Sequence, residues 1–296
     1  MDFTPIGVLR ENKKEDKKIW SFKKLNLKQN IFISPLVLFI ITLLCILAPL
    51  ITHVDPTYME LSKVFVSPCR ENIFGTDHLG RDIFSRVLYG GRISITIGVL
   101  SMIISTVFGV IYGSVSGYFG GIIDDYMMRF IDIMISIPSL LVMTLIQSIL
   151  QSNKVGSIVL VIAVTSWMNI AKIVRSEVLE LKQREFVLAS KVMGADFIHI
   201  TKKHLIPNFI PAIIYMSTVN SANAIMAETT LSFLGLGLPV EVPSWGSMLM
   251  DAQNSILLNK WWVALFPGVF MVATIFGITN VGEYIRVKNN KKFNNI

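Results

Sequence analysis

The sequence predicts an all-α, polytopic membrane protein with six transmembrane helices and one further helix in a cytosolic loop. Three observations predict this fold: an apolar composition, six long apolar runs, and basic residues gathered in a few segments. Of the 296 residues, 52% are hydrophobic and 16% are charged, and the mean hydropathy of +0.59 is far above that of an ordinary soluble domain. We therefore expect much of the protein surface to face lipid.

Six apolar runs are long enough to cross a bilayer, because about 20 mostly apolar residues span roughly 30 Å of hydrocarbon. The runs are residues 31–53, 93–116, 133–150, 155–174, 208–234 and 262–282. The first run is long and follows a polar leader of 30 residues, so we expect it to be a span and not a cleaved signal peptide.

The basic residues predict the orientation, because short loops rich in Lys and Arg stay in the cytoplasm. Residues 1–30 carry eight of them, 172–204 carry seven and 283–296 carry four, which together make 19 of the 27 in the chain. The segments 54–92 and 235–261 show no such excess. We expect both termini to be cytoplasmic, which agrees with an even number of spans.

One membrane domain with five segments accounts for the whole chain, since no repeat or low-complexity stretch is evident. The segments are a cytosolic N-terminal leader (1–30), the first transmembrane helix (31–53), an extracytoplasmic loop (54–92), a five-helix core (93–282) that includes a cytosolic loop (175–207), and a cytosolic basic tail (283–296).

The net charge of +7 does not indicate nucleic-acid binding. The basic residues cluster next to the predicted spans, where anionic lipid headgroups attract each of them by about 1 kcal/mol. We expect contact with the lipid bilayer and none with nucleic acid. Cys45 lies in the first predicted span and Cys69 in the extracytoplasmic loop, so we expect no disulfide between them.

Motifs for bond chemistry are missing from the sequence. A phosphate-binding loop ends in Gly-Lys-Ser/Thr, and the nearest string, GTDHLGRD at 75–82, has Arg81 and Asp82 there instead. No HExxH or GxSxG motif occurs, and no pair of carboxylates is expected in a polar pocket. The histidines are scattered over both predicted faces of the membrane: His53, His78, His199 and His204. We expect no catalytic residue and no metal site.

The cytosolic loop contains a segment of helical periodicity over 185–197. Its apolar residues recur at three- and four-residue spacing: Phe186, Ala189, Met193 and Phe197. Such a helix fits either a groove on a partner protein or the membrane surface, and periodicity alone does not separate the two. We expect Gly194 to end the helix or to allow a close backbone approach, and Pro207 to mark the start of the fifth span.

The same segment resembles the coupling loop of the permeases of ABC importers, with the pattern Glu-Ala-Ala, three residues, Gly, nine residues, Ile, one residue, Leu-Pro. That spacing falls on Leu188-Ala189-Ser190, Gly194, His204, Ile206 and Pro207. Ala189, Gly194 and Pro207 match, and the other four positions depart from the pattern.

Five further blocks resemble the subfamily of dipeptide, oligopeptide and nickel permeases. They are GTDHLGRDIFSRVLYGGRIS (75–94), MMRFIDIMISIPSLL (127–141), LSFLGLGLP (231–239), PSWGSML (243–249) and LFPG (265–268). They occur in the order expected for the subfamily, and the leader, the single span before the GTDxLGRD block and the six spans are typical of its second, C-type permease. The fold implied is that of type I ABC importer permeases.

The resemblance implies one half of a heterodimeric transmembrane pathway for short peptides, in a bacterial plasma membrane. Nickel or a nickel chelate is the alternative substrate. The implied partners are a second permease, two cytosolic ATPases and an extracytoplasmic substrate-binding protein. The ATPases would use ATP and Mg²⁺, and this chain would bind no cofactor. ATP binding would draw the ATPases together and move the 185–197 helix as a lever.

The residues expected at the ATPase-coupling surface come from this loop. They are Glu185, Phe186, Leu188, Ala189, Ser190, Met193, Gly194 and Pro207. A solvated position in the first turn of a helix explains Glu185 as well as a contact to the ATPase does.

Two acids near the bilayer are candidates for the translocation path, because charges at membrane depth are costly. Asp132 also fits an ion pair with Arg129 at the cytosolic mouth of the third span, and we favour that reading. Glu228 lies deeper in the fifth span and is the better candidate for the path or its gate. Pro138 predicts a kink in the third span.

Two further features bear on packing and on the extracytoplasmic side. The spacing of Gly109, Gly113 and Gly117 predicts a face where two helices pack closely. The stretch 235–247 is rich in Gly and Pro, and its Trp245 fits either a docking surface for the binding protein or an interfacial anchor.

A different class of function, an ion-coupled secondary carrier, is the remaining alternative. Such a carrier is expected to show inverted repeats, broken helices and several ionisable residues at mid-membrane. No repeat is evident, and only Asp132 and Glu228 approach that depth. The sequence therefore favours the importer subunit.

Overall fold

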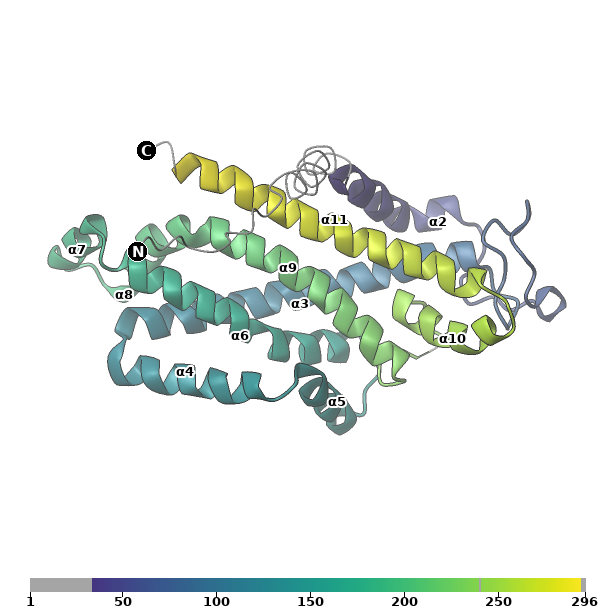
Figure 1. The fold of residues 1–296 in the computed structure, drawn as a ribbon, viewed down its shortest axis with the longest axis horizontal. Helices are drawn as coiled ribbons and strands as arrows, with labels where there is room; N and C mark the ends of the chain where they lie inside the picture. The colour runs from purple at the N-terminus through teal and green to yellow at the C-terminus, as the bar shows by residue number, and fades with distance from the viewer. Residues whose placement is uncertain (1–33, 240, 294–296) are drawn as a thin grey trace, which may run out of the picture.

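The fold is an elongated helical bundle, seen in a computed structural model that describes residues 34–239 and 241–293 (Figure 1). Four stretches in this part of the chain are long and apolar enough to cross a membrane. They are α3 (Ile83–Phe119), α6 (Val155–Leu181), the stretch Phe197–Phe233 that ends in α9 (Ile206–Phe233), and α11 (Trp262–Phe293). The described residues form no strand elements, so the predicted all-α fold class is confirmed.

The first predicted span, 31–53, contains a helix over Ser34–Ile46 and the short helix α2 (Ala48–Ile51). Pro49 lies in the first turn of α2, where the missing N–H of proline costs no helical hydrogen bond. The leader 1–30 and residues 31–33 lie outside the described residues, so these parts of the prediction stay untested.

The second predicted span begins earlier than expected. The prediction placed residues up to 92 in a loop, whereas α3 begins at Ile83. Asp82 caps this helix, because its carboxylate accepts hydrogen bonds from the backbone N–H of Ser85 at 2.8 Å and from the hydroxyl of Ser85 at 2.7 Å. The charge of Arg86 in the first turns hid the helix from a hydropathy count.

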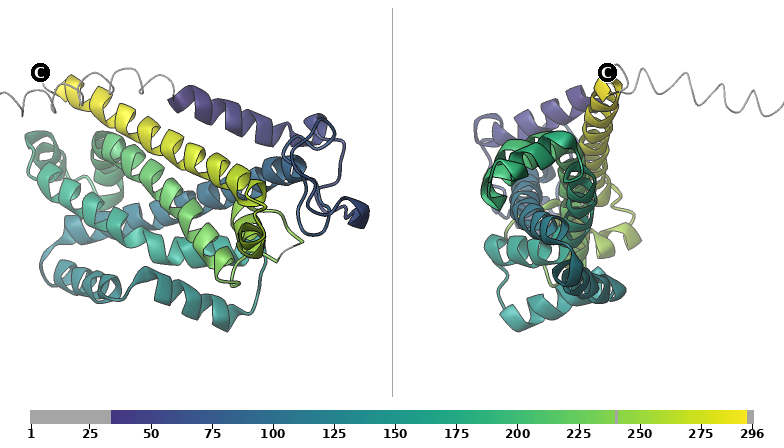
Figure 2. Two further views of the ribbon diagram at one scale, coloured as in Figure 1. Left: turned by 45° about the vertical axis from the view of Figure 1, so that its right-hand side comes forward. Right: turned by 90° about the vertical axis from the view of Figure 1, so that its left-hand side faces the viewer.

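The third predicted span, 133–150, is wrong as a continuous helix. It crosses α4 (Gly121–Ser136) and α5 (Ser139–Leu150), which are bent by 87° at the break between them. Pro138 disfavours helical geometry at the preceding residue, and Ile137 is extended, with φ −90° and ψ 128°. Figure 2 shows both helices on the side of the bundle opposite α11.

The glycine face on α3 packs against α6, as predicted. A Cβ atom at Gly109 would lie 2.9 Å from the carbonyl oxygen of Trp167, and one at Gly117 would lie 2.9 Å from the carbonyl oxygen of Arg175. A Cβ at Gly113 would overlap the backbone of Ala171. Because real side chains do not approach a carbonyl so closely, only glycine lets these two helix backbones meet.

The remaining elements lie at the two ends of the bundle (Figure 1). The α7 end holds α7 (Glu185–Val192), α8 (Phe197–Ile200) and a π-helical turn (Thr201–Leu205). The α10 end holds the 52–82 loop, with a 3₁₀ turn at Leu61–Lys63, and α10 (Trp245–Leu257), which hydropathy did not predict.

Two predicted boundaries shift by several residues. Residues 175–181, predicted to be loop, are the last turns of α6. Residues 283–293 of the predicted tail continue α11. The helices therefore extend beyond the apolar runs, because a helix can continue once its residues leave the hydrocarbon region.

Candidate functional site

At the α7 end, Gly194 and Asp196 determine where α7 ends and α8 begins. This residue has a φ of +85°, and its N–H donates to the carbonyl of Lys191 at 3.0 Å, so it terminates α7. Asp196 then caps α8 by accepting a hydrogen bond from the N–H of His199 at 3.0 Å. The predicted helix end at Gly194 is confirmed, but the predicted single helix 185–197 is wrong because α7 ends at Val192.

The reason for glycine at position 194 is its backbone conformation. A Cβ atom added to Gly194 would meet nothing within 4 Å. Close approach therefore does not explain the residue within this chain, whereas the positive φ does, because it costs an L-residue about 1–2 kcal/mol.

The side of α7 that is buried within this chain is not the apolar stripe, which was predicted to face a partner protein or the membrane surface. Val187 and Ser190 are the buried residues of this helix, whereas Met193 is 80% exposed. Phe186 and Ala189 are also exposed. The predicted stripe is thus open for a contact outside this chain, whereas burial of Val187 and Ser190 depends on α8 and the π-helical turn, whose positions a helical wheel does not contain.

The solvent-exposed side of the α7 end is apolar, and we call it the α7 apolar surface. Its residues are Phe186, Leu188, Val192 and Met193, with exposed fractions of 43%, 48%, 89% and 80%. An exposed apolar group of this kind on a protein is typical of an interface. Glu185 is exposed in the first turn of α7, and Pro207 is exposed in the first turn of α9.

An ion pair fixes the base of the α7 end. The guanidinium of Arg175 on α6 donates to both carboxylate oxygens of Asp124 on α4, each at 2.5 Å. Lys182, next to α7, donates to the carbonyl of Gly117 on α3 at 2.8 Å. A bidentate pair of this type holds two helices in one geometry. This pair could not be predicted from the sequence, since the partners are 51 residues apart.

Asp132 does not pair with Arg129 as predicted. The ammonium group of Lys172 on α6 lies 2.6 Å from the Asp132 carboxylate, and the two side chains are 42% and 61% exposed. An exposed pair contributes little to stability. Asp132 thus forms a bridge between α4 and α6, and it does not line the polar pocket described below.

Glu228 is fully buried where α3, α9 and α10 meet. Its carboxylate accepts hydrogen bonds from the hydroxyls of Ser94 at 3.2 Å, Ser232 at 2.8 Å and Ser244 at 2.8 Å. Ser244 is also the N-cap of α10, since it accepts the N–H of Ser247. The carboxylate contacts no open space in this conformation, and its partners favour a positioning role over a place on the path.

Trp245 is buried, not exposed at a membrane interface or docking surface. Its indole N–H donates to the carbonyl of Val87 at 3.0 Å, and its backbone N–H donates to the hydroxyl of Ser94 at 3.2 Å. Both predicted roles of Trp245 are therefore wrong. Burial of the ring instead fixes the start of α10 against α3.

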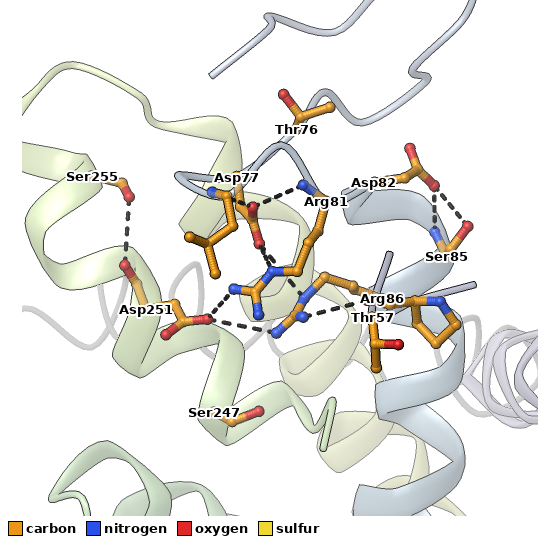
Figure 3. Close-up of polar contacts among 12 residues, drawn as sticks. Thr57, Thr76, Asp77, Arg81, Asp82, Ser85, Arg86, Ser247, Asp251 and Ser255 are labelled. Atoms are coloured by element: carbon orange, nitrogen blue, oxygen red, sulfur yellow. Dashed lines mark hydrogen bonds and ion pairs between the residues drawn. The ribbon is translucent and has the colours of Figure 1, made fainter. Parts of the chain in front are cut away.

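Four charged side chains form a cluster between the 52–82 loop, α3 and α10 (Figure 3). Arg81 Nε lies 2.6 Å from Asp77, and Arg81 Nη2 lies 2.8 Å from Asp251. Arg86 reaches Asp251 at 3.5 Å and Asp77 at 3.8 Å. Burial raises the pKa of the Asp251 carboxyl, and the attraction of the two guanidinium groups opposes that rise. We call these residues the arginine–aspartate cluster.

The cluster explains the GTDHLGRD string as a structural element. Gly75 and Gly80 have φ of +76° and +71°, and a Cβ at Gly75 would lie 2.6 Å from the carbonyl oxygen of Val66. His78 brings one nitrogen within 4.8 Å of carboxylate oxygens of Asp77 and Asp251, a spacing that would also suit a metal ion. Because both carboxylates already contact guanidinium groups, the charge balance does not favour a cation there.

A polar pocket of about 380 Å³ lies between α5, α6 and α9. Its polar residues include Ser139 on α5, Ser166 and Asn169 on α6, and Asn220 and Asn223 on α9. Sequence reasoning missed this pocket, because uncharged polar residues only slightly lower the hydropathy of a span. Their spacing on the separate helices was the available signal.

Comparison with known proteins identifies the family of this chain. Residues 105–286 match the family model described as "Binding-protein-dependent transport system inner membrane component". The dipeptide transport system permease protein DppC of Bacillus subtilis (strain 168) is 38% identical over 83% of this chain and 77% of its own length.

Two oligopeptide transport system permease proteins named OppC are similar over most of their length. That of Bacillus subtilis (strain 168) is 37% identical over 95% of this chain and 92% of its own. That of Escherichia coli (strain K12) is 38% identical over 86% of this chain and 84% of its own. The chain is therefore a multi-pass membrane protein that belongs to the family of inner membrane components of binding-protein-dependent transport systems.

Proposed function

We propose that this chain is one of two permease subunits of an ATP-driven importer of short peptides. The observation that carries the proposal is the α7 apolar surface at one end of a bundle whose other end holds the 52–82 loop and α10. The relatives named as dipeptide and oligopeptide permeases support peptides as the substrate. The chain itself performs no bond chemistry, which belongs to separate ATPase subunits.

The proposal assigns one partner to each exposed part of the chain. The α7 apolar surface contacts one of two cytosolic ATPases, which use ATP and Mg²⁺, and this chain holds no cofactor. The α10 end faces outward toward a substrate-binding protein, and a second permease completes the pathway. Lipid of a bacterial plasma membrane covers the rest, and both termini are cytoplasmic. The excess of Lys and Arg in 172–204 supports this orientation.

The packing of α7 gives the coupling a physical route. Val187 belongs to a buried cluster with Ile200 and Leu205, and the same cluster contains Val174 of α6 and Phe209 of α9. A displacement of α7 by the ATPase therefore acts on two of the three helices that line the polar pocket. Closely packed cores move as units, so the motion reaches the pathway as a shift of whole helices.

Neither alternative function gains support from the structure. A nickel site needs ligands such as His or Cys, and neither residue type lines the polar pocket. An ion-coupled carrier needs an ionisable residue accessible from the path. Glu228 is buried and Asp132 does not line the polar pocket, so neither offers such a residue there.

Substitution at Gly194 tests the coupling. Gly194→Leu places a side chain at a φ of +85°, so we expect the loop to change shape and peptide uptake to fall about tenfold, which corresponds to the strain of about 1–2 kcal/mol. The measurement is uptake of a labelled tripeptide by cells, together with ATP hydrolysis by the purified complex. ATP hydrolysis should continue without its normal stimulation by the binding protein.

Gly156→Leu is the matched control for this experiment. A Cβ at Gly156 also meets nothing within 4 Å, but that glycine lies on α6 without a positive φ. We expect normal uptake from this variant. If Gly194→Leu shows wild-type uptake and wild-type stimulation of ATP hydrolysis by the binding protein, the α7 loop takes no part in the coupling.

A further inference from the structure

The polar pocket is lined without any charged residue, histidine or cysteine. Its exposed polar side chains come from three helices: Ser139 from α5, Asn169 from α6, and Asn223 and Thr230 from α9. Asn220 lies deeper, and its amide donates to the hydroxyl of Ser105 on α3 at 2.6 Å. The lining therefore offers amide and hydroxyl groups and no fixed charge.

The pocket contains side-chain amides without hydrogen-bond partners, and contact of such amides with lipid has a large free-energy cost. Asn169 and Asn223 are exposed, and their side chains have no hydrogen-bond partner within the described part of the chain. Both belong to stretches apolar enough to span a membrane. An unsatisfied amide facing hydrocarbon costs several kcal/mol, so this face of α6 and α9 must border water or a polar surface.

The broken span supports the same conclusion. Residues Ile137 and Pro138 interrupt the helix between α4 and α5, and Ser139 at the start of α5 lines the pocket. Non-helical backbone at membrane depth is tolerated only where it is enclosed by protein or lines a water-filled cavity. The break and the free amides lie at the same pocket, and they are independent observations.

The chemistry of the lining matches a peptide backbone. An asparagine amide offers two donors and one acceptor oxygen, and a hydroxyl offers both functions. Backbone N–H and C=O groups occur in every peptide, whatever its side chains. Hydrogen bonds from uncharged groups also bind a peptide weakly. Weak binding suits a pathway, because the solute must leave it again.

We propose that the polar pocket is this chain's contact site for the backbone of a peptide in transit, and that it does not discriminate peptides by charge. The inference rests on the proposed function and deepens it. It implies that selection of peptides by charge takes place at the binding protein and not at this pocket. Charged side chains of the peptide would then lie in the water of the pathway or against the second permease.

A charge introduced into the pocket tests the site. We expect Asn223→Asp and Asn169→Asp, each made separately, to raise the uptake ratio of Ala-Lys-Ala to Ala-Glu-Ala about fivefold over wild type, since a carboxylate in a watery site attracts one peptide and repels the other. Both peptides are measured in cells that express the complete transporter. Selection by the binding protein cancels in the comparison with wild type.

Two controls separate the pocket from general effects of charge and shape. Asn153→Asp adds the same charge at an exposed position between α5 and α6 that does not line the pocket, and it should leave the ratio unchanged. Asn223→Ala should lower the uptake of both peptides alike at an unchanged ratio, because it removes hydrogen bonds without adding charge. Wild-type ratios in both pocket Asp variants at normal abundance would overturn the inference.

Thiol labelling keeps the inference testable if an Asp variant fails to assemble. With Cys69 replaced by serine and Cys45 buried, Asn223→Cys provides one accessible thiol, and Asn169→Cys in a second variant provides another. We expect a membrane-impermeant maleimide to label each during turnover and excess tri-alanine to slow that labelling. A thiol that stays unlabelled at position 223 and at position 169 would place the pocket against lipid and overturn the inference.

The proposed function fails in a distinguishable way. If cells without this chain take up all three peptides normally, the chain is not a peptide permease. If that uptake is lost while the pocket variants keep the wild-type ratio and labelling shows no water, only the pocket assignment is wrong.

Discussion

Replacing Arg81 with leucine is expected to destabilise the protein by about 3–5 kcal/mol, the typical cost of removing one partner from a buried ion pair. The Arg81 side chain is 1% exposed and contacts both Asp77 and Asp251. Without it, two carboxylates would share the single charge of Arg86, whose contacts are longer, at 3.5 and 3.8 Å. The 52–82 loop would then detach from α10.

The measurement for Arg81→Leu is the melting temperature of the purified protein, with limited proteolysis of the 52–82 loop. Arg70→Leu is the matched control, because Arg70 lies on the same loop and is exposed. The double variant Arg81→Leu with Asp251→Leu should recover part of the loss, because it removes one charge of each sign. A melting temperature of Arg81→Leu equal to that of wild type would contradict a structural role for the cluster.

Replacing Glu228 with leucine is the second change with a large expected effect. It leaves the hydroxyls of Ser94, Ser232 and Ser244 without their acceptor, and each lost partner of a buried polar group costs about 1–3 kcal/mol. We expect little folded protein and almost no peptide uptake. Glu228→Gln keeps the shape and one acceptor oxygen, so it should retain most of the uptake per folded molecule.

The pair of Glu228 variants separates a positioning residue from a gate. A positioning residue predicts that uptake falls in proportion to folded protein, measured as abundance and melting temperature. A residue that lines the path or gates it predicts that Glu228→Gln folds normally and yet loses transport. The second result would restore the role that the sequence suggested for Glu228.

The long helices could be predicted well because the signal for a membrane-spanning helix lies within its own residues. The runs that became α6, α9 and α11 are apolar over enough residues to span a membrane, whatever their neighbours are. The glycine spacing on α3 was equally informative. Helix α10 was missed, since a short helix held by Ser244 and by the burial of Trp245 has no long apolar run.

The contacts made by polar side chains were the part that sequence could not supply. Asp132 pairs with Lys172, 40 residues away, instead of with the nearby Arg129. The depth of Glu228 in its span was visible, but its serine partners from α3 and α10 were not. For α7, the break at Gly194 follows from local backbone physics, whereas the buried face depends on tertiary packing.

Uptake in cells that lack only this chain is the most direct test of the central claim. We predict that a labelled tripeptide no longer enters these cells, that nickel uptake at low concentration is unchanged, and that the restored gene recovers peptide uptake. Uptake in the restored cells should persist in a protonophore as long as cellular ATP is maintained. Loss of nickel uptake alone, or peptide uptake that stops with the proton gradient at unchanged ATP, would contradict an ATP-driven peptide importer.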